Sequence, residues 1–174
     1  MNQRKSGRGG ILTAFYRKKH PGVPDDKIPY YYRRSITGEI WHLIRKSICQ
    51  NIAPNCVLNP VRLWLYRLCG FKIGKNCFIG MKCYFDDLCV DKIVIGDNVT
   101  ISYGVYFACH GRKQDHNYIE IKNGAYIGMC TSVTARHDIV IGENSIVGAK
   151  ALVNKSVEDG MTVVGVPARP LKER

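Results

Sequence analysis

The residues from Ile73 to Glu158 divide into units of six, and this repeat decides the fold. The first three units read Ile73-Gly-Lys-Asn-Cys-Phe, Ile79-Gly-Met-Lys-Cys-Tyr and Phe85-Asp-Asp-Leu-Cys-Val. The other nine begin at Ile95, Ile101, Phe107, Ile121, Ile127, Val133, Ile141, Val147 and Val153. All twelve begin with a large apolar residue, six have glycine second, and eleven have a small residue or valine fifth. His137 is the exception at the fifth position.

This pattern predicts a parallel β-solenoid in which each unit forms a short strand and a bend. The first side chain fills the interior, the fifth lies beside it, and glycine suits close backbone approach or positive φ. Three units complete one three-sided coil, and stacked coils bury a core that no single unit could bury. We therefore expect about four coils over residues 73–160. Cys77, Cys83 and Cys89 are predicted to be small apolar fillers at fifth positions.

Insertions interrupt the repeat at three places, and they are four, eight and two residues long. Each insertion follows the third unit of a coil, so all three are predicted to lie at the same edge of the prism. Loops stacked along one edge are where a solenoid displays functional groups. The longest insertion lies within residues 111–120 and contains Arg112, Lys113, Asp115 and His116.

The positive charge belongs to the part of the chain before the repeat. Residues 1–34 hold nine Lys and Arg against two acids, residues 35–72 hold five against one, and residues 73–174 hold twelve against eleven. A nearly neutral repeat region argues against nucleic acid as a partner, because a nucleic-acid-binding domain concentrates Lys and Arg on its own face. Residues 1–34 are interrupted by Pro21, Pro24 and Pro29 and are predicted to be an extended basic arm.

Residues 35–72 are predicted to form a short helical cap. The apolar face of a helix over residues 36–48 would consist of Ile36, Ile40, Trp41, Ile44 and Ile48. A second helix is expected to start with Asn59 as N-cap and Pro60 in the first turn, and to end at Gly70. We expect the helices to cover the open end of the solenoid. The alternative is an interfacial helix that rests on anionic lipid. Residues 161–174 are assigned to a C-terminal strand and a basic tail.

Composition excludes several other classes of protein. The chain has 174 residues, of which 45% are hydrophobic and 23% charged, which is typical of one globular domain with an appendage. No apolar run approaches the roughly 18 residues of a membrane span, and the basic N-terminus is not followed by the apolar core of a signal peptide. We therefore expect a cytoplasmic protein. The eight cysteines include no C-x-x-C pair, so neither a zinc ribbon nor a thioredoxin-like site is expected. A disulfide framework is not expected either, because nothing else in the sequence suggests secretion.

The repeats and the closing Val163-Val164-Gly165-Val166-Pro167-Ala168-Arg169 resemble those of the hexapeptide-repeat acyltransferases over about residues 71–172. The stretch from Ile95 to Lys172 is most similar to maltose and galactoside O-acetyltransferases. Residues 65–74 resemble the start of bacterial capsule and exopolysaccharide O-acetyltransferases. The resemblance implies a left-handed parallel β-helix, acetyl-CoA as acyl donor without a metal, and a homotrimer. Serine acetyltransferases share the solenoid, but about 70 preceding residues are too few for their long helical N-terminal domain.

The resemblance places the catalytic histidine at His110, at the edge that carries the longest insertion. Its implied role is that of a general base, which takes the proton from an acceptor hydroxyl as that oxygen attacks the acetyl thioester. Cys109 precedes it, but neighbouring residues of a strand point to opposite faces, so the two are poorly placed to form a nucleophilic dyad.

Stacking supplies further candidates at this edge. Asp86 and Asp87 should lie one coil below His110, where a carboxylate would either orient the imidazole or bind acceptor hydroxyls. His116, in the insertion, is predicted to reach across a subunit boundary toward the acceptor. His137 breaks the small-residue rule and indicates a local bulge.

Acetyl-CoA requires a slot for its pantetheine arm and cations for its phosphates. The resemblance places Gly128, Met129 and Ala149 along that slot between neighbouring prisms, with a backbone N–H near Gly128 facing the developing oxyanion. The basic residues that correspond to nucleotide-binding positions are Lys150, Lys155, Arg169 and Lys172.

The sequence thus predicts an acetyl-CoA-dependent O-acetyltransferase that acts on a sugar or glycan in a cleft between subunits, with polysaccharide biosynthesis as its setting. The basic N-terminal region would either hold it near a lipid-linked glycan at the inner face of a membrane or lengthen the contact within the trimer. Alternatives left open are an N-acetyltransferase on an amino sugar or sugar nucleotide, a xenobiotic acetyltransferase, and a noncatalytic assembly solenoid. A γ-carbonic-anhydrase-like enzyme would require zinc held by histidines such as His110, His116 and His137.

Overall fold

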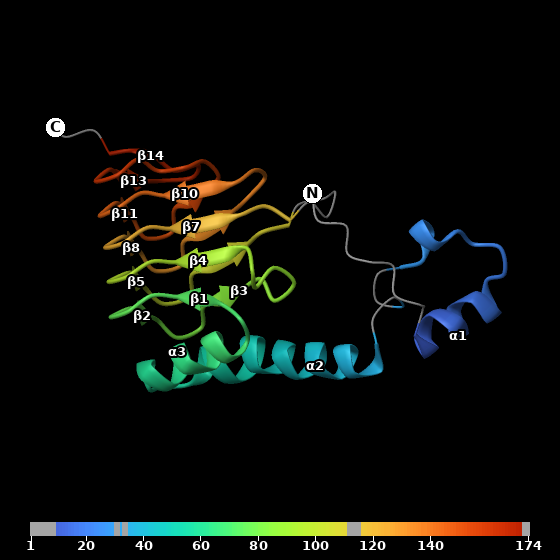
Figure 1. The fold of residues 1–174 in the computed structure, drawn as a ribbon. Helices are drawn as coiled ribbons and strands as arrows, with labels where there is room; N and C mark the ends of the chain where they lie inside the picture. The colour runs from blue at the N-terminus through green and yellow to red at the C-terminus, as the bar shows by residue number, and fades with distance from the viewer. Residues whose placement is uncertain (1–9, 30–31, 33–34, 111–115, 172–174) are drawn as a thin grey trace. The chain divides into compact units, whose positions relative to one another are not determined.

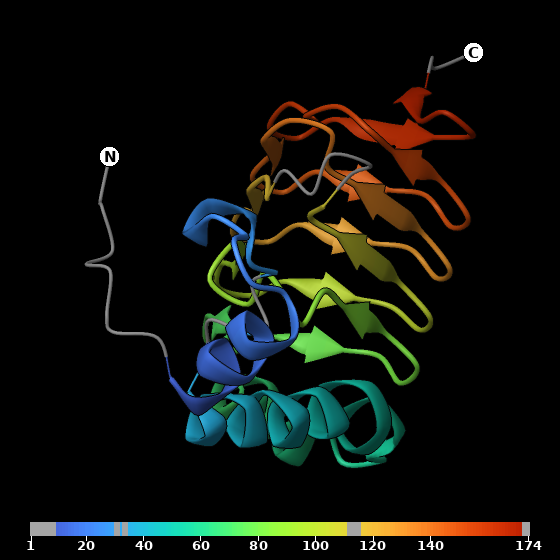
Figure 2. The same ribbon diagram turned by 90° about the vertical axis from the view of Figure 1, so that its right-hand side faces the viewer.

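The structure is a computed structural model that describes residues 10–29, 32, 35–110 and 116–171, without the side chain of residue 26. The chain forms two compact units, Met1–Arg45 and Lys46–Arg174. In the second unit, parallel strands stack in register along three sheets, which form the three faces of a solenoid (Figures 1 and 2).

Each coil contributes one strand to each of the three sheets. The first sheet has the order β1-β4-β7-β10, with β1 at Lys72–Ile73, β4 at Ile93–Ile95, β7 at Ile119–Ile121 and β10 at Ile139–Ile141. The second has the order β14-β13-β11-β8-β5-β2, with β2 at Phe78–Ile79, β5 at Thr100–Ile101, β8 at Tyr126–Ile127, β11 at Ile146–Val147, β13 at Thr162–Val164 and β14 at Arg169–Pro170. The third has the order β12-β9-β6-β3, with β3 at Tyr84–Phe85, β6 at Tyr106–Ala108, β9 at Ser132–Thr134 and β12 at Leu152–Val153. All pairs are parallel except β13 with β14, where the chain turns back and ends the stack.

The strand register confirms the predicted repeat and the position of its insertions. Ile73 pairs with Ile95, Ile95 with Ile121, and Ile121 with Ile141. These spacings equal one coil plus each insertion. The insertions therefore lie between the third and first sheets, at one edge of the prism, as the sequence predicted.

The interior is filled by the first and fifth side chains of the units. One column of first-position side chains runs through successive coils and is fully buried: Ile79, Ile101, Ile127 and Val147. At the fifth positions the side chains from Cys77 to Val157 that the structure describes are buried, apart from His137. Gly128 shows why a second-position glycine is needed, because an added Cβ would lie 2.5 Å from the backbone nitrogen of Ala149 in the next coil.

A helical cap covers the lower end of the solenoid, where the backbone groups of the first coil have no neighbouring strand. It consists of one π-helical turn, η3 (Ile48–Ile52), a 3-10 turn, η4 (Ala53–Asn55), and α3 (Asn59–Leu68). The Asn59 amide accepts the N–H of Ile79 at 3.1 Å and donates to the carbonyl of Cys77 at 3.1 Å, as a neighbouring strand would. The buried Arg62 guanidinium donates to the carbonyl of Ile79 at 2.5 Å. These bonds satisfy groups that an open edge would leave unpaired.

The prediction that Asn59 is the N-cap of this helix was wrong. Leu58 occupies the N-cap position, and Asn59 is the first helical residue. The Asn59 side chain bonds to the strand edge of the solenoid and not to the first turn of its own helix. These bonds attach the helical cap to the sheet edge that it covers.

The first unit contains α1 (Ile11–Lys19), a 3-10 turn, η1 (Asp25–Lys27), and most of α2 (Ile36–Ser47). The prediction of an extended arm over residues 1–34 was wrong for residues 11–19. An apolar stretch from Ile11 to Tyr16 comes before the first proline, and nothing in it prevents a helix. The helix predicted over residues 36–48 is confirmed as α2. Among the described residues, no helix is long and apolar enough to cross a membrane.

Candidate active site

His110 lies just after β6, at the edge of the prism that carries the insertions. Its side chain is 30% exposed, and it forms an antiparallel bridge with His116, so the two residues close the base of the insertion. Asp86 follows β3 in the coil below, and the pairing of Phe85 with Phe107 brings it under the residues that lead to His110. The predicted stacking of Asp86 near His110 is therefore observed.

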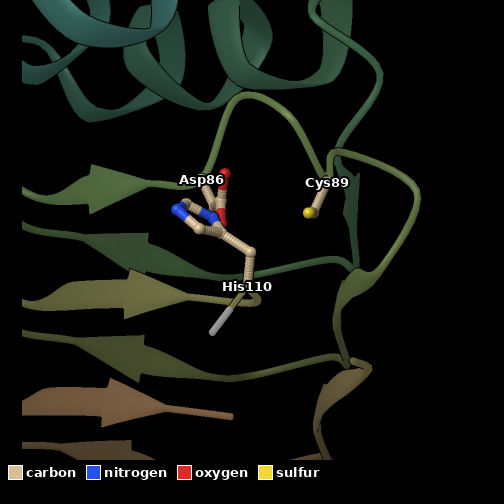
Figure 3. Close-up of side chains that lie close together, drawn as sticks. All are labelled: Asp86, Cys89 and His110. Carbon is tan, nitrogen blue, oxygen red and sulfur yellow. The ribbon is translucent and has the colours of Figure 1, made fainter. Parts of the chain in front are cut away.

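The Asp86 carboxylate is fully buried and bonds directly to the His110 ring. Its Oδ2 lies 2.5 Å from Nδ1 of His110 and accepts the N–H of Cys109 at 3.0 Å, and its Oδ1 accepts the N–H of Leu88 at 3.2 Å. An ionised carboxylate is only an acceptor, so a neutral His110 ring paired with it carries its proton on Nδ1 and keeps a free lone pair on Nε2. Figure 3 shows the carboxylate against the ring. This bond fixes the orientation of the His110 ring.

Full burial of Asp86 favours one of the two roles predicted for it. A carboxylate with no exposed surface cannot contact an acceptor sugar, so its geometry fits orientation of His110 and not substrate binding. Asp87 is 4% exposed and accepts a bond from the Gln50 amide at 3.2 Å, which ties it to the cap. His116 is exposed at the base of the insertion. Arg112, Lys113 and Asp115 lie outside the described residues.

Cys109 points into the prism, opposite to His110. It is fully buried, and burial, followed by the neighbouring Cys89 and Asp86, raises the pKa of its thiol. A thiol with a raised pKa stays protonated near neutral pH and is a poor nucleophile. This agrees with the expectation that Cys109 does not form a dyad with His110.

Cys89, which the repeat pattern predicts only as a core filler, is a neighbour of the site. It is buried as predicted, but its sulfur, the Asp86 carboxylate and a His110 ring nitrogen all lie within 4.8 Å of one another. Burial, followed by the charge of Asp86, raises the pKa of Cys89 to about 12. The signal that could have found it is the spacing Asp86-x-x-Cys89, read together with the predicted stacking of Asp86 below His110.

Four of the residues predicted to bind the cofactor, Gly128, Met129, Ala149 and Lys150, lie along another edge of the prism. Met129 and Ala149 occupy the same place in consecutive coils, in the bends after β8 and β11, and both are exposed. The N–H of Gly128 donates to the carbonyl of Val147 at 2.8 Å, so this N–H belongs to the sheet. The predicted basic positions Lys150, Lys155 and Arg169 are exposed, and Lys172 lies outside the described residues.

The three histidines considered for a zinc enzyme do not gather within one chain. Among the described residues, the cluster that could hold a metal ion combines His110 with Asp86 and Cys89, and includes neither His116 nor His137. Both of those histidines are exposed.

Comparison with known proteins gives sequence relatives that are acetyltransferases. No family model matches the chain. It is 32% identical over 124 residues to galactoside O-acetyltransferase of Escherichia coli strain K12, a match that covers 63% of this chain and 60% of the relative. It is 35% identical over 106 residues to serine acetyltransferase of Staphylococcus aureus strain Mu50, covering 60% of this chain and 47% of the relative. The chain thus spans between about half and three fifths of these relatives.

A solved structure shares the fold. The hexapeptide-repeat containing acetyltransferase of Vibrio cholerae O1 biovar eltor, complexed with acetyl coenzyme A, superposes with a TM-score of 0.60 at 22% identity, covering 79% of this chain and 88% of that chain. The chain is therefore a left-handed β-helix protein built from hexapeptide repeats. Its sequence relatives are acetyltransferases, which confirms the resemblance predicted above.

Proposed function

We propose that this chain transfers an acetyl group from acetyl-CoA to a hydroxyl of a sugar or glycan, with His110 as general base. The observation that carries the proposal is the bond between Asp86 and Nδ1 of His110 at the insertion-bearing edge. It leaves Nε2 able to take the acceptor's proton while the oxygen attacks the thioester. The acetyl group then passes directly to the acceptor, and the leaving thiolate of coenzyme A takes up the proton. The acetyltransferase relatives support the reaction class.

A thiol-release assay with acetyl-CoA tests this function on a panel of acceptors. The panel includes galactosides, maltose, amino sugars, lipid-linked glycans and serine, because both sugar and serine acetyltransferases are among the relatives. We expect coenzyme A release that depends on a hydroxyl-bearing sugar and exceeds the release seen with serine or an amine. Release without any dependence on acceptor, or on serine alone, would contradict the proposed substrate class.

We propose further that the active form is a homotrimer with the site between copies. His110 lies at the edge between the third and first sheets, whereas Met129 and Ala149 lie at the edge between the second and third sheets. A second copy is needed to bring these edges together. The second sheet and its bends also expose large apolar side chains, including Tyr103, Tyr126, Met129 and Ile146. Light scattering should give the mass of three chains, and a stable monomer with full activity would refute the shared site.

The N-terminal region is proposed to bind anionic lipid at the inner face of a membrane. The exposed apolar side chains of α2 include Ile36, Ile40, Trp41, Leu43 and Ile44. Residues 1–34 carry the excess of Lys and Arg, which favours an anionic surface. We expect the full chain to float with phosphatidylserine-containing vesicles at low salt and to be released as salt screens the attraction. Equal behaviour with purely zwitterionic vesicles would contradict the electrostatic part of this proposal.

A further inference from the structure

Three potential metal ligands of different chemistry lie close together, and one of them is the candidate base, His110. The Asp86 carboxylate, the Cys89 sulfur and a ring nitrogen of His110 lie within 4.8 Å of one another. Figure 3 shows that Asp86 and Cys89 come from the same bend, which follows β3, and that His110 reaches them from the next coil, on the side away from the helical cap. Asp86 is 0% and Cys89 1% exposed, whereas His110 is partly open to solvent. The cluster is thus held by the core of the solenoid and has one accessible side.

We propose that Asp86, Cys89 and His110 form a site for a thiophilic divalent cation such as Zn²⁺, and that occupancy switches off the general base. Thiolate, imidazole and carboxylate together are ligands that select zinc over Mg²⁺ or Ca²⁺. With bonds of about 2.0–2.3 Å, tetrahedral zinc needs ligand atoms roughly 3.3–3.8 Å apart, so a small side-chain movement completes the set. Water would fill the fourth position from the exposed side of His110.

Binding changes the protonation of the cluster in a defined way. The metal replaces the proton between Nδ1 of His110 and Asp86, and the neutral ring then carries its proton on Nε2. The Cys89 thiol loses its proton to solvent as the metal–sulfur bond forms. Nε2 no longer has a lone pair, so it cannot accept the proton of an acceptor hydroxyl. The catalytic consequence rests on the proposed function, whereas the binding site itself does not.

Cobalt(II) titration of the chelator-treated full-length protein tests the site without reference to activity. We expect one cobalt per chain with the near-ultraviolet charge-transfer absorption of a thiolate–cobalt bond. Cys89→Ser should lose that absorption. Cys83→Ser is the matched control, because Cys83 is also buried at a fifth position, where its thiol donates to the carbonyl of Ser102 at 3.1 Å. Absorption that is missing in the native protein, or that persists in Cys89→Ser, would overturn the proposal.

Zinc inhibition then tests the consequence. Zinc should lower turnover of the native protein and of Cys83→Ser by about 100-fold, the scale of losing a general base, and a chelator should restore it. The ratio of turnover with and without zinc should approach one in Cys89→Ser. Cobalt binding in a protein that transfers no acetyl group would refute the proposed function and leave the site standing. Full transfer activity that zinc does not inhibit would refute the switch alone.

Discussion

His110→Ala is expected to lower turnover of acetyl-CoA with a sugar acceptor by about 10²–10⁴-fold, the contribution of a positioned general base. The base acts in the transition state, so the KM for acetyl-CoA should change much less than kcat. Added imidazole should restore part of the turnover, because the truncated side chain is at the partly exposed edge of the prism. Steady-state thiol release measures all three effects.

His137→Ala is the matched control for this substitution. His137 is an exposed histidine one coil above His110, at the same edge of the prism, and no role in proton transfer is assigned to it. We expect it to keep native turnover. If His110→Ala also kept native turnover, the base would have to be another group, and the assignment of Asp86 as its orienting partner would fail with it.

The coils and the stacking of Asp86 below His110 could be predicted from the sequence, because both depend on the repeat of large apolar residues that form the core. Once Phe85 and Phe107 are recognised as equivalent interior positions, the residues that follow them must stack. The proximity of Cys89 to Asp86 and His110 was not predicted, because burial in the core already explains a cysteine at a fifth position. Nothing in the repeat distinguishes Cys89 from Cys83, and only the bend that carries Asp86 brings its sulfur to the site.

Other features depend on contacts that no repeat encodes. Asn59 reads as a helix cap because asparagine before proline favours that position, but the open strand edge at Cys77 and Ile79 takes its amide instead. Tertiary contact thus overrides a local signal. The proposed meeting of the His110 edge with the Met129 edge could not be derived from a single chain, because it would depend on how surfaces of separate copies complement one another.

Asp86 is a positioning residue, because its proposed effect on catalysis acts through His110. Replacing Asp86 tests whether His110 depends on this partner. Asp86→Ala should lower kcat by about 100-fold or more while the KM for acetyl-CoA stays near its native value, because the lost group fixes the tautomer and stabilises the protonated ring. Nitrogen NMR of histidine-labelled protein should show the ring proton on Nδ1 in the native chain, and loss of that preference in the variant. A merely structural carboxylate would not set the tautomer.

The same substitution should cost stability, and a control separates that cost from catalysis. Removing the buried carboxylate leaves the N–H groups of Cys109 and Leu88 without their acceptor, at a cost of about 1–3 kcal/mol each. Asp138→Ala is the control, since Asp138 also accepts a backbone N–H, that of Tyr118 at 2.7 Å, but is exposed. It should keep native turnover and the native His110 tautomer. If Asp86→Ala lowered the melting temperature but kept kcat and the tautomer, His110 would be oriented by its backbone bridge with His116, and the carboxylate would serve the fold alone.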